Sequence, residues 1–215
     1  MSAAPPRFIT LEGGEGAGKS TQCRLLESAL AARGISCVRT REPGGSPGAE
    51  DIRKLLVEGE PGRWSALTEA MLMFAARTDH VAQTIKPALA RGEWVLCDRF
   101  TDSSYAYQGA GRGLDRETIR RIESVSIGDF RPNLTLILDV PVAVGFGRVT
   151  ARAHAVSRFE RFDEAFHERL RAAFLDIARR APERCAVIDA GGTEDEVAAR
   201  IWGVVTARLL NETAA

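Results

Sequence analysis

The sequence predicts an α/β fold in which a five-stranded parallel sheet is covered by helices on both faces. Five short runs are rich in β-forming residues, and they lie at 8–11, 37–39, 94–97, 134–138 and 186–188. Longer segments with helical spacing separate them, near 19–33, 67–91, 115–125, 162–180 and 194–210. The short runs lack a clean alternation of apolar and polar residues, which is typical of strands buried on both faces of a parallel sheet. In such sheets ligands bind at the carboxyl ends of the strands, so we expect the chemistry in the loops that follow them.

The composition fits one globular domain. The chain has 215 residues, and its 29 basic side chains balance 29 acidic ones. We interpret residues 1–215 as a single domain whose residues 1–6 form a loose leader without an apolar signal core. Zero net charge argues against a nucleic-acid or membrane-surface binder, and no apolar run has the length of a membrane span. The four cysteines are far apart, which indicates reduced thiols in a cytoplasmic protein.

The first predicted strand runs into GGEGAGKS at residues 13–20, which fits the phosphate-loop pattern G-x-x-x-x-G-K-[ST]. Its glycines allow backbone N–H groups to turn around phosphate oxygens, and the next helix adds the positive end of its dipole. In this pattern Lys19 reaches the β- and γ-phosphates, and the Ser20 hydroxyl binds Mg²⁺. Lys19 is one of three lysines beside 26 arginines. The predicted ATP site comprises Gly13, Gly14, Glu15, Gly16, Ala17, Gly18, Lys19, Ser20 and Thr21.

The rest of the sequence indicates which class of phosphate-loop protein this is. A GTPase would need an N-K-x-D segment, but neither Asn133 nor Asn211 is followed by lysine. A small kinase fits the length best. Two alternatives stay open: a glycine-rich turn that only caps a helix, and an ATP-gated interaction module without turnover.

The third predicted strand ends in Asp98 and Arg99. Adjacent strand residues point to opposite faces, so Asp98 is expected to hold Mg²⁺ while Arg99 faces the acceptor phosphate. The guanidinium of Arg99 suits bidentate phosphate binding. The structural alternative is a salt bridge at the end of a strand.

Two further segments offer candidates for the acceptor site. In the predicted helix 67–91, Phe74 falls on an apolar helical stripe that is typical of a core, yet Arg77 lies one turn away. The pair is suited to stacking a base and donating to its exocyclic oxygen. Residues 101–108 are dense in hydroxyl and amide groups, and the alternative is a polar loop that leads into a helix.

Together these motifs resemble the thymidylate (dTMP) kinase family, in its bacterial branch. The similar segments are LEGGEGAGKS at 11–20, TREPGGS at 40–46, MFAAR at 73–77, CDRF at 97–100 and SSYAYQG at 103–109. The resemblance runs from residue 8 to about 201. It implies a three-layer P-loop kinase fold, transfer of the γ-phosphoryl group of ATP to dTMP with Mg²⁺, and a homodimer. A kinase for another nucleoside monophosphate is the alternative.

The resemblance also implies an acceptor site made of Glu42, Arg53, Phe74, Arg77, Arg99, Ser104, Tyr107 and Gln108. In it Phe74 stacks on thymine, Arg77 bonds O4, and Gln108 lies at the base edge. Arg53 and Arg99 bind the dTMP phosphate, and Tyr107 crowds the 2′ position.

Residues 147–160 resemble the mobile lid of this family. Arg158 is the best-aligned candidate to reach the phosphates and Arg152 is the second, although such arginines also solvate flexible loops. Gly16 stands where some members carry a phosphate-loop arginine, so we expect the lid to supply the missing charge. The phosphate of dTMP is mostly dianionic at pH 7 and needs no general base, and we expect the three histidines to be structural.

Overall fold

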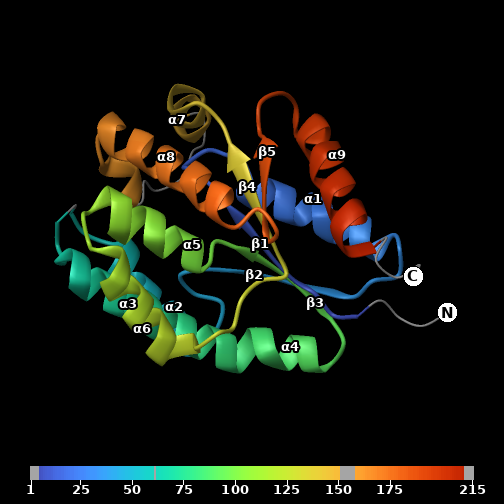
Figure 1. Ribbon diagram of the computed structural model, residues 1–215, viewed down its shortest axis with the longest axis horizontal. Helices are drawn as coiled ribbons and strands as arrows, with labels where there is room; N and C mark the ends of the chain where they lie inside the picture. Colours follow the sequence, from blue (N-terminus) through green and yellow to red (C-terminus); the bar gives the residue numbers. More distant parts are fainter. Residues whose placement is uncertain (1–4, 61, 151–157, 211–215) are drawn as a thin grey trace.

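The computed structural model describes residues 5–60, 62–150 and 158–210, and it contains the predicted sheet (Figure 1). The strands are β1 (Phe8–Glu12), β2 (Cys37–Arg41), β3 (Trp94–Asp98), β4 (Leu134–Asp139) and β5 (Cys185–Asp189). All neighbouring strands pair in parallel, in the order β2-β3-β1-β4-β5. The predicted α/β fold is confirmed.

The helices cover both faces of this sheet. The α-helices are α1 (Lys19–Ala31), α2 (Pro47–Val57), α3 (Ala66–His80), α4 (Lys86–Ala90), α5 (Thr101–Ser104), α6 (Arg116–Ile127), α7 (Val142–Thr150), α8 (Glu164–Arg180) and α9 (Glu194–Val205). Shorter turns of other helical types are η1 (Val81–Ile85), η2 (Tyr105–Gly111), η3 (Arg158–Arg161) and η4 (Thr206–Leu210). Figure 1 shows α1 and α9 together on one side of the sheet and α8 on the other.

The core follows the alternation of side chains along the strands. Ile9 and Leu11 of β1 point to the side of α1 and α9, where one apolar cluster forms. Phe8 points the opposite way and joins a cluster with η1 and α4. Ile137 of β4 lies in a third cluster, beneath α8 and η2. Burial on both faces therefore explains why the three inner strands, β3, β1 and β4, are buried along almost their whole length, whereas the edge strands β2 and β5 have exposed positions.

The predicted helices agree with the structure except where helices are short. The segment predicted near 67–91 is one continuous helical stretch, α3-η1-α4, which begins where Ser65 Oγ accepts from the backbone N–H of Thr68. The alternative that 101–108 is only a polar loop does not hold, because α5 and η2 fill this segment. Two helices were not predicted: α2, which starts with a proline and a glycine, and α7, which reaches into the predicted lid.

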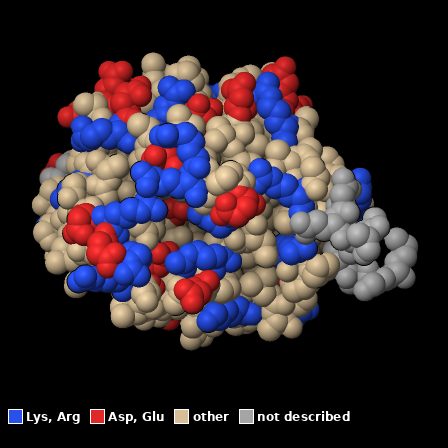
Figure 2. Space-filling view, in the orientation of Figure 1, with Lys and Arg blue, Asp and Glu red and all other residues tan. Residues whose placement is uncertain are grey.

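Charges of both signs cover the visible face of the molecule. Figure 2 shows Lys and Arg side chains interspersed with Asp and Glu, as expected for a net charge of zero. Within the described part of the chain, every helix is too short or too polar to span a bilayer.

Candidate active site

Lys19 folds back over the phosphate loop between β1 and α1. Its Nζ donates to the carbonyl oxygen of Gly14 at 2.7 Å and to that of Gly13 at 3.2 Å. Burial lowers the pKa of Lys19, and the nearby charge of Arg99 lowers it further, although acidic neighbours oppose both effects. An anion stabilises the charged form of a buried ammonium that lies beside another cation, and a phosphate group is such an anion.

Ser20 and Asp98 meet where α1 starts and β3 ends. The Ser20 hydroxyl donates to Oδ2 of Asp98 at 2.5 Å, so two hard oxygen ligands lie side by side. Mg²⁺ prefers such ligands and usually completes its shell with phosphate oxygens and water. No cluster of three or more His, Cys, Asp or Glu side chains that could hold a metal exists among the described residues. The pair therefore fits a Mg²⁺ ion that shares its ligands with a nucleotide.

Arg99 connects the phosphate loop to Tyr107. Its backbone has a φ of 72°, which is uncommon for a residue other than glycine. Its guanidinium donates to the carbonyl of Gly13 at 3.0 Å and to Oε1 of Glu15 at 2.9 Å. The same group lies 4.9 Å from the ring centre of Tyr107. Arg99 thus presents positive charge beside the loop that is predicted to hold the transferred phosphate.

Glu15 is the acidic counterpart of these cations. Burial on its own would raise the pKa of Glu15, but Arg99, Lys19 and the Tyr107 hydroxyl lower it to about 2. The hydroxyl donates to Oε1 at 2.7 Å. Glu15 therefore stays ionised near neutral pH, and it holds Arg99 and Tyr107 in place.

This low pKa predicts how stability depends on pH. Because the pKa is lower in the folded chain than its ordinary value of 4.5, Glu15 stabilises the fold above pH 4.5 and loses this effect as the pH falls toward 2. We expect wild type to exceed Glu15→Gln by up to about 3 kcal/mol in free energy of unfolding at pH 7. Urea titrations at pH 7 and pH 3 test this, and a difference that does not shrink at pH 3 would contradict it.

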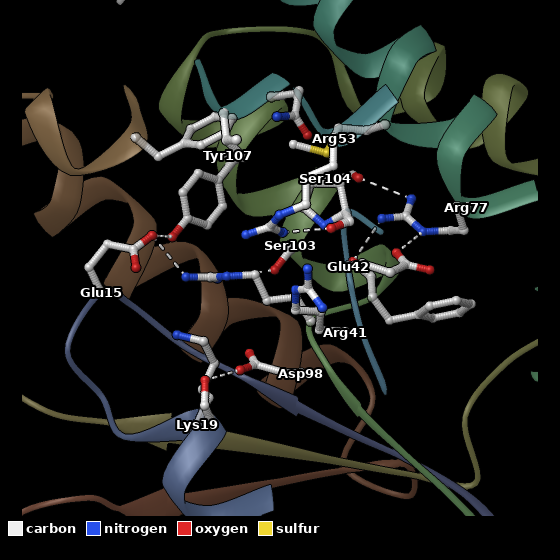
Figure 3. Close-up of a pocket in the computed structure, with 18 of the residues that line it drawn as sticks. Glu15, Lys19, Arg41, Glu42, Arg53, Arg77, Asp98, Ser103, Ser104 and Tyr107 are labelled. Carbon is white, nitrogen blue, oxygen red and sulfur yellow. Dashed lines mark hydrogen bonds and ion pairs between the residues drawn. The ribbon is translucent and has the colours of Figure 1, made fainter. Parts of the chain in front are cut away.

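One cavity of about 340 Å³ gathers most of the predicted site residues. Among its lining are Glu15, Gly16, Gly18, Lys19, Ser20, Glu42, Arg53, Arg77, Asp98, Arg99, Ser104, Tyr107 and Gln108. Figure 3 shows Lys19 and Asp98 at one end, Tyr107 turned toward Glu15, and Arg77 on the opposite side with Glu42. Arg77 donates to Oε2 of Glu42 at 2.7 Å and to Oγ of Ser104 at 3.1 Å. Gly13, Gly14, Ala17, Thr21, Phe74 and Arg158 do not line the cavity.

Phe74 is buried beside Arg77 and does not line the cavity, so its predicted role in stacking on a base stays a prediction. Its side chain is 1% exposed, and its ring lies 4.5 Å from the guanidinium carbon of Arg77. The wall of the cavity at this place is Met73. Met73 is four residues before Arg77, so the two side chains are separated by about 40° around the helix axis. Phe74 is three residues before Arg77 and is separated from it by about 60° in the other direction. Met73 therefore lies closer to the helix face of Arg77.

Two variants separate these roles. Met73→Ala is expected to raise the KM for dTMP about tenfold, because a half-buried thioether leaves the cavity wall, with little loss of stability. Phe74→Leu is expected to lower the free energy of unfolding by about 1–3 kcal/mol and to change this KM little. Steady-state kinetics and thermal melts of both variants test these expectations. A raised KM for dTMP in Phe74→Leu together with an unchanged KM in Met73→Ala would instead support Phe74 as the residue that contacts the base.

Arg158 also differs from the expectation of a lid arginine that reaches the phosphates. It is fully buried, and it donates to Oε2 of Glu69 at 2.5 Å and to the carbonyl of Leu56 at 3.0 Å. With these partners it anchors η3 to α2 and α3, and it does not line the cavity. The second candidate, Arg152, lies outside the described residues.

His80 has the structural role that the sequence suggested. Its two ring nitrogens lie 3.0 Å from Oε1 of Glu42 and 2.7 Å from Oγ1 of Thr40. Several cavity residues were not predicted, namely Arg41, Pro43, Val57, Met73, Phe100, Ser103, Val149 and Phe159. Arg41, Pro43, Met73, Phe100 and Ser103 lie inside the motifs quoted above, which was the available signal.

Comparisons with known proteins agree with this geometry. The family model described as thymidylate kinase matches residues 11–201. The chain is 57% identical to a thymidylate kinase of Caulobacter vibrioides over 202 residues, which are 94% of this chain and 97% of that protein. It is 53% identical to one of Rhizorhabdus wittichii over 92% of this chain and 95% of that protein. The crystal structure of thymidylate kinase from Ehrlichia chaffeensis superposes with a TM-score of 0.77, at 34% identity, over 93% of this chain and 98% of that one.

The predicted family is thereby confirmed, and with it the enzyme class. The match covers the phosphate loop, all residues that line the cavity, the end of β1 and the other four strands. This chain belongs to the thymidylate kinase family, the kinases that phosphorylate dTMP in dTTP synthesis.

Proposed function

We propose that the cavity beside the phosphate loop is where this thymidylate kinase brings its two substrates together, with ATP on the phosphate loop and dTMP on the opposite wall. One observation carries the proposal. The same cavity has Lys19 and Asp98 at one end and Arg77 and Ser104 at the other, and Ser20 and Gln108 also line it (Figure 3). A kinase needs this arrangement, because two polyanions have to meet in line.

In the proposed reaction an oxygen of the dTMP phosphate attacks the γ-phosphorus of ATP. This phosphate is mostly dianionic at pH 7, so the attacking oxygen needs no general base. Lys19 and Arg99 offset the negative charge that the two substrates bring to the site. Ser20 and Asp98 would hold Mg²⁺, which when bound neutralises charge on the ATP phosphates.

The acceptor is proposed to lie with its phosphate at Arg53 and Arg99 and its base at Arg77 and Gln108. Arg53 donates to the carbonyl of Pro43 at 2.6 Å, which supports a fixed position for its guanidinium at the cavity wall. Tyr107 is fixed by Glu15, so its ring is a rigid wall where the sugar would lie. A rigid ring at that place favours a sugar without a 2′-hydroxyl.

An acceptor screen tests the proposal. ADP release is followed with dTMP, dUMP, dCMP, dGMP and AMP as acceptors at saturating ATP and Mg²⁺. We expect dTMP to have the highest kcat/KM. We expect dUMP to be about 10- to 200-fold poorer, because it lacks only one methyl group. A higher kcat/KM for another nucleotide would overturn the choice of acceptor, and ATP binding without turnover would favour an interaction module.

We further propose that the enzyme is a homodimer that pairs through α3 and its neighbours. Leu67 and Met71 are one turn apart on α3 and are 42% and 55% exposed, and Leu55 on α2 is 40% exposed. Apolar side chains gathered on an outer face favour association. Sedimentation velocity is expected to give a dimer for wild type and a shift toward monomer for Met71→Glu. A monomeric wild type would contradict this.

The cytoplasm is the proposed location. All four cysteines carry free thiols, which suits a reducing compartment.

A further inference from the structure

Glu69 of α3 has a fully buried carboxylate that receives hydrogen bonds from three side chains in two other segments of the chain. Nε2 of Gln108 donates to its Oε1 at 2.9 Å. Nη1 of Arg112 and Nη2 of Arg158 donate to its Oε2 at 2.7 Å and 2.5 Å. Glu69 does not itself line the cavity, whereas Gln108 does. It therefore touches the proposed acceptor site only through a neighbour.

The arginines decide how the Gln108 amide is turned. A carboxylate that is paired with two guanidinium groups only accepts hydrogen bonds. Gln108 has to offer it the NH₂ end of its amide, because the oxygen end would meet another acceptor. Of the two orientations open to an amide, only one satisfies Glu69.

That orientation leaves the amide oxygen of Gln108 available. Oε1 is buried and has no hydrogen-bond partner among the described residues. Buried acceptors in native proteins are nearly always paired, and an unpaired one is costly. Because Gln108 lines the cavity, an N–H group on the molecule that fills the cavity is the donor that such an atom calls for.

We propose that Glu69 is a positioning residue for the choice of acceptor base, because it fixes Gln108 with its oxygen toward that base. The proposal rests on the proposed function, since it takes the occupant to be a nucleoside monophosphate. Thymine and uracil carry an N–H at position 3, whereas N3 of cytosine is itself an acceptor. Glu69 thus favours dTMP and dUMP over dCMP without touching any of them.

Glu69→Gln is expected to reverse the orientation of the Gln108 amide and thereby weaken the preference for bases with an N3–H. Arg112 and Arg158 can donate only to the oxygen of the new amide, so the NH₂ group of this amide faces Gln108. Gln108 then has to turn its oxygen toward position 69 and its NH₂ toward the cavity. We expect the kcat/KM ratio of dTMP to dCMP to fall at least about tenfold. The ratio of dTMP to dUMP should stay within about twofold, because both bases keep the N3–H.

A second variant guards against loss of the fold, since removing a charge from a buried ion pair is destabilising. Glu69→Asp keeps the charge for the arginines but is one methylene too short to hold Gln108. It should also lower the ratio of dTMP to dCMP. The matched control is Arg112→Met, which removes one donor to Oε2 and leaves the bond to Gln108 intact. It should lower the melting temperature and keep the ratio.

The double variant with Gln108→Met tests whether Glu69 acts through Gln108. Once the amide is gone, Glu69→Asp should have no further effect on the ratio of dTMP to dCMP. The proposal is overturned if Glu69→Asp folds with an unchanged ratio, or if it lowers the ratio equally without the amide. Wild type that fails to phosphorylate dTMP would instead refute the proposed function, so the two failures are distinguishable.

Discussion

Lys19→Ala is expected to lower kcat by about 10²- to 10³-fold, the usual effect of losing one preorganised charge at a reacting centre. The ammonium is buried and held by two loop carbonyls, so its place does not depend on a flexible side chain. Water does not replace a charge in such a position. The fold should survive, because the variant removes no apolar contact of the core.

Lys54→Ala is the matched control, since Lys54 is one of the three lysines and pairs with Asp51 on the surface of α2. It should keep the wild-type kcat. Rapid-quench measurement of a single turnover separates the chemical step from product release. A Lys19→Ala enzyme with a normal single-turnover rate would refute the role of the phosphate loop.

Gly16→Ala is expected to lower the free energy of unfolding by about 3 kcal/mol, which corresponds to about 6–12 °C in melting temperature. Gly16 has a φ of +70°, and a Cβ atom there would lie 2.0 Å from the carbonyl oxygen of Gly145 in α7. Both partners are backbone, so neither can move aside without shifting the phosphate loop or α7. We therefore expect kcat to fall together with stability.

Gly14→Ala is the control in the same loop, because a Cβ atom at Gly14 meets nothing within 4 Å. Its melting temperature should match that of wild type. Gly145→Ala should repeat the defect from the other side, since its Cβ would lie 2.4 Å from the carbonyl oxygen of Glu15. Equal melting temperatures for Gly14→Ala and Gly16→Ala would contradict the close packing.

This packing also bears on the cation that the lid was expected to supply. Gly16 stands where some members are expected to carry an arginine, and we expected the lid to compensate. The backbone of α7 occupies the space that a side chain at Gly16 would need. Arg158, the favoured substitute, is paired with Glu69 instead. Among the described residues, Arg99 is the cation that best fits the task.

The sequence by itself determined the fold class, the phosphate loop and the family. Strand-length apolar runs and helical spacing depend on the properties of neighbouring residues, and the loop motif is contiguous, so both can be read along the chain. Asp98 and Arg99 were also found this way, because the end of a buried strand is visible as a change from apolar to charged residues.

Only the tertiary structure decided which face of a helix meets the cavity and which charges pair across the fold. Met73 and Phe74 are adjacent and both apolar, and only the packing of α3 turns one to the cavity and the other to the core. Glu69 and Arg158 are 89 residues apart, and no local pattern marks their ion pair. Local sequence sets propensity and motif, whereas the partner of a buried charge depends on contacts between distant segments.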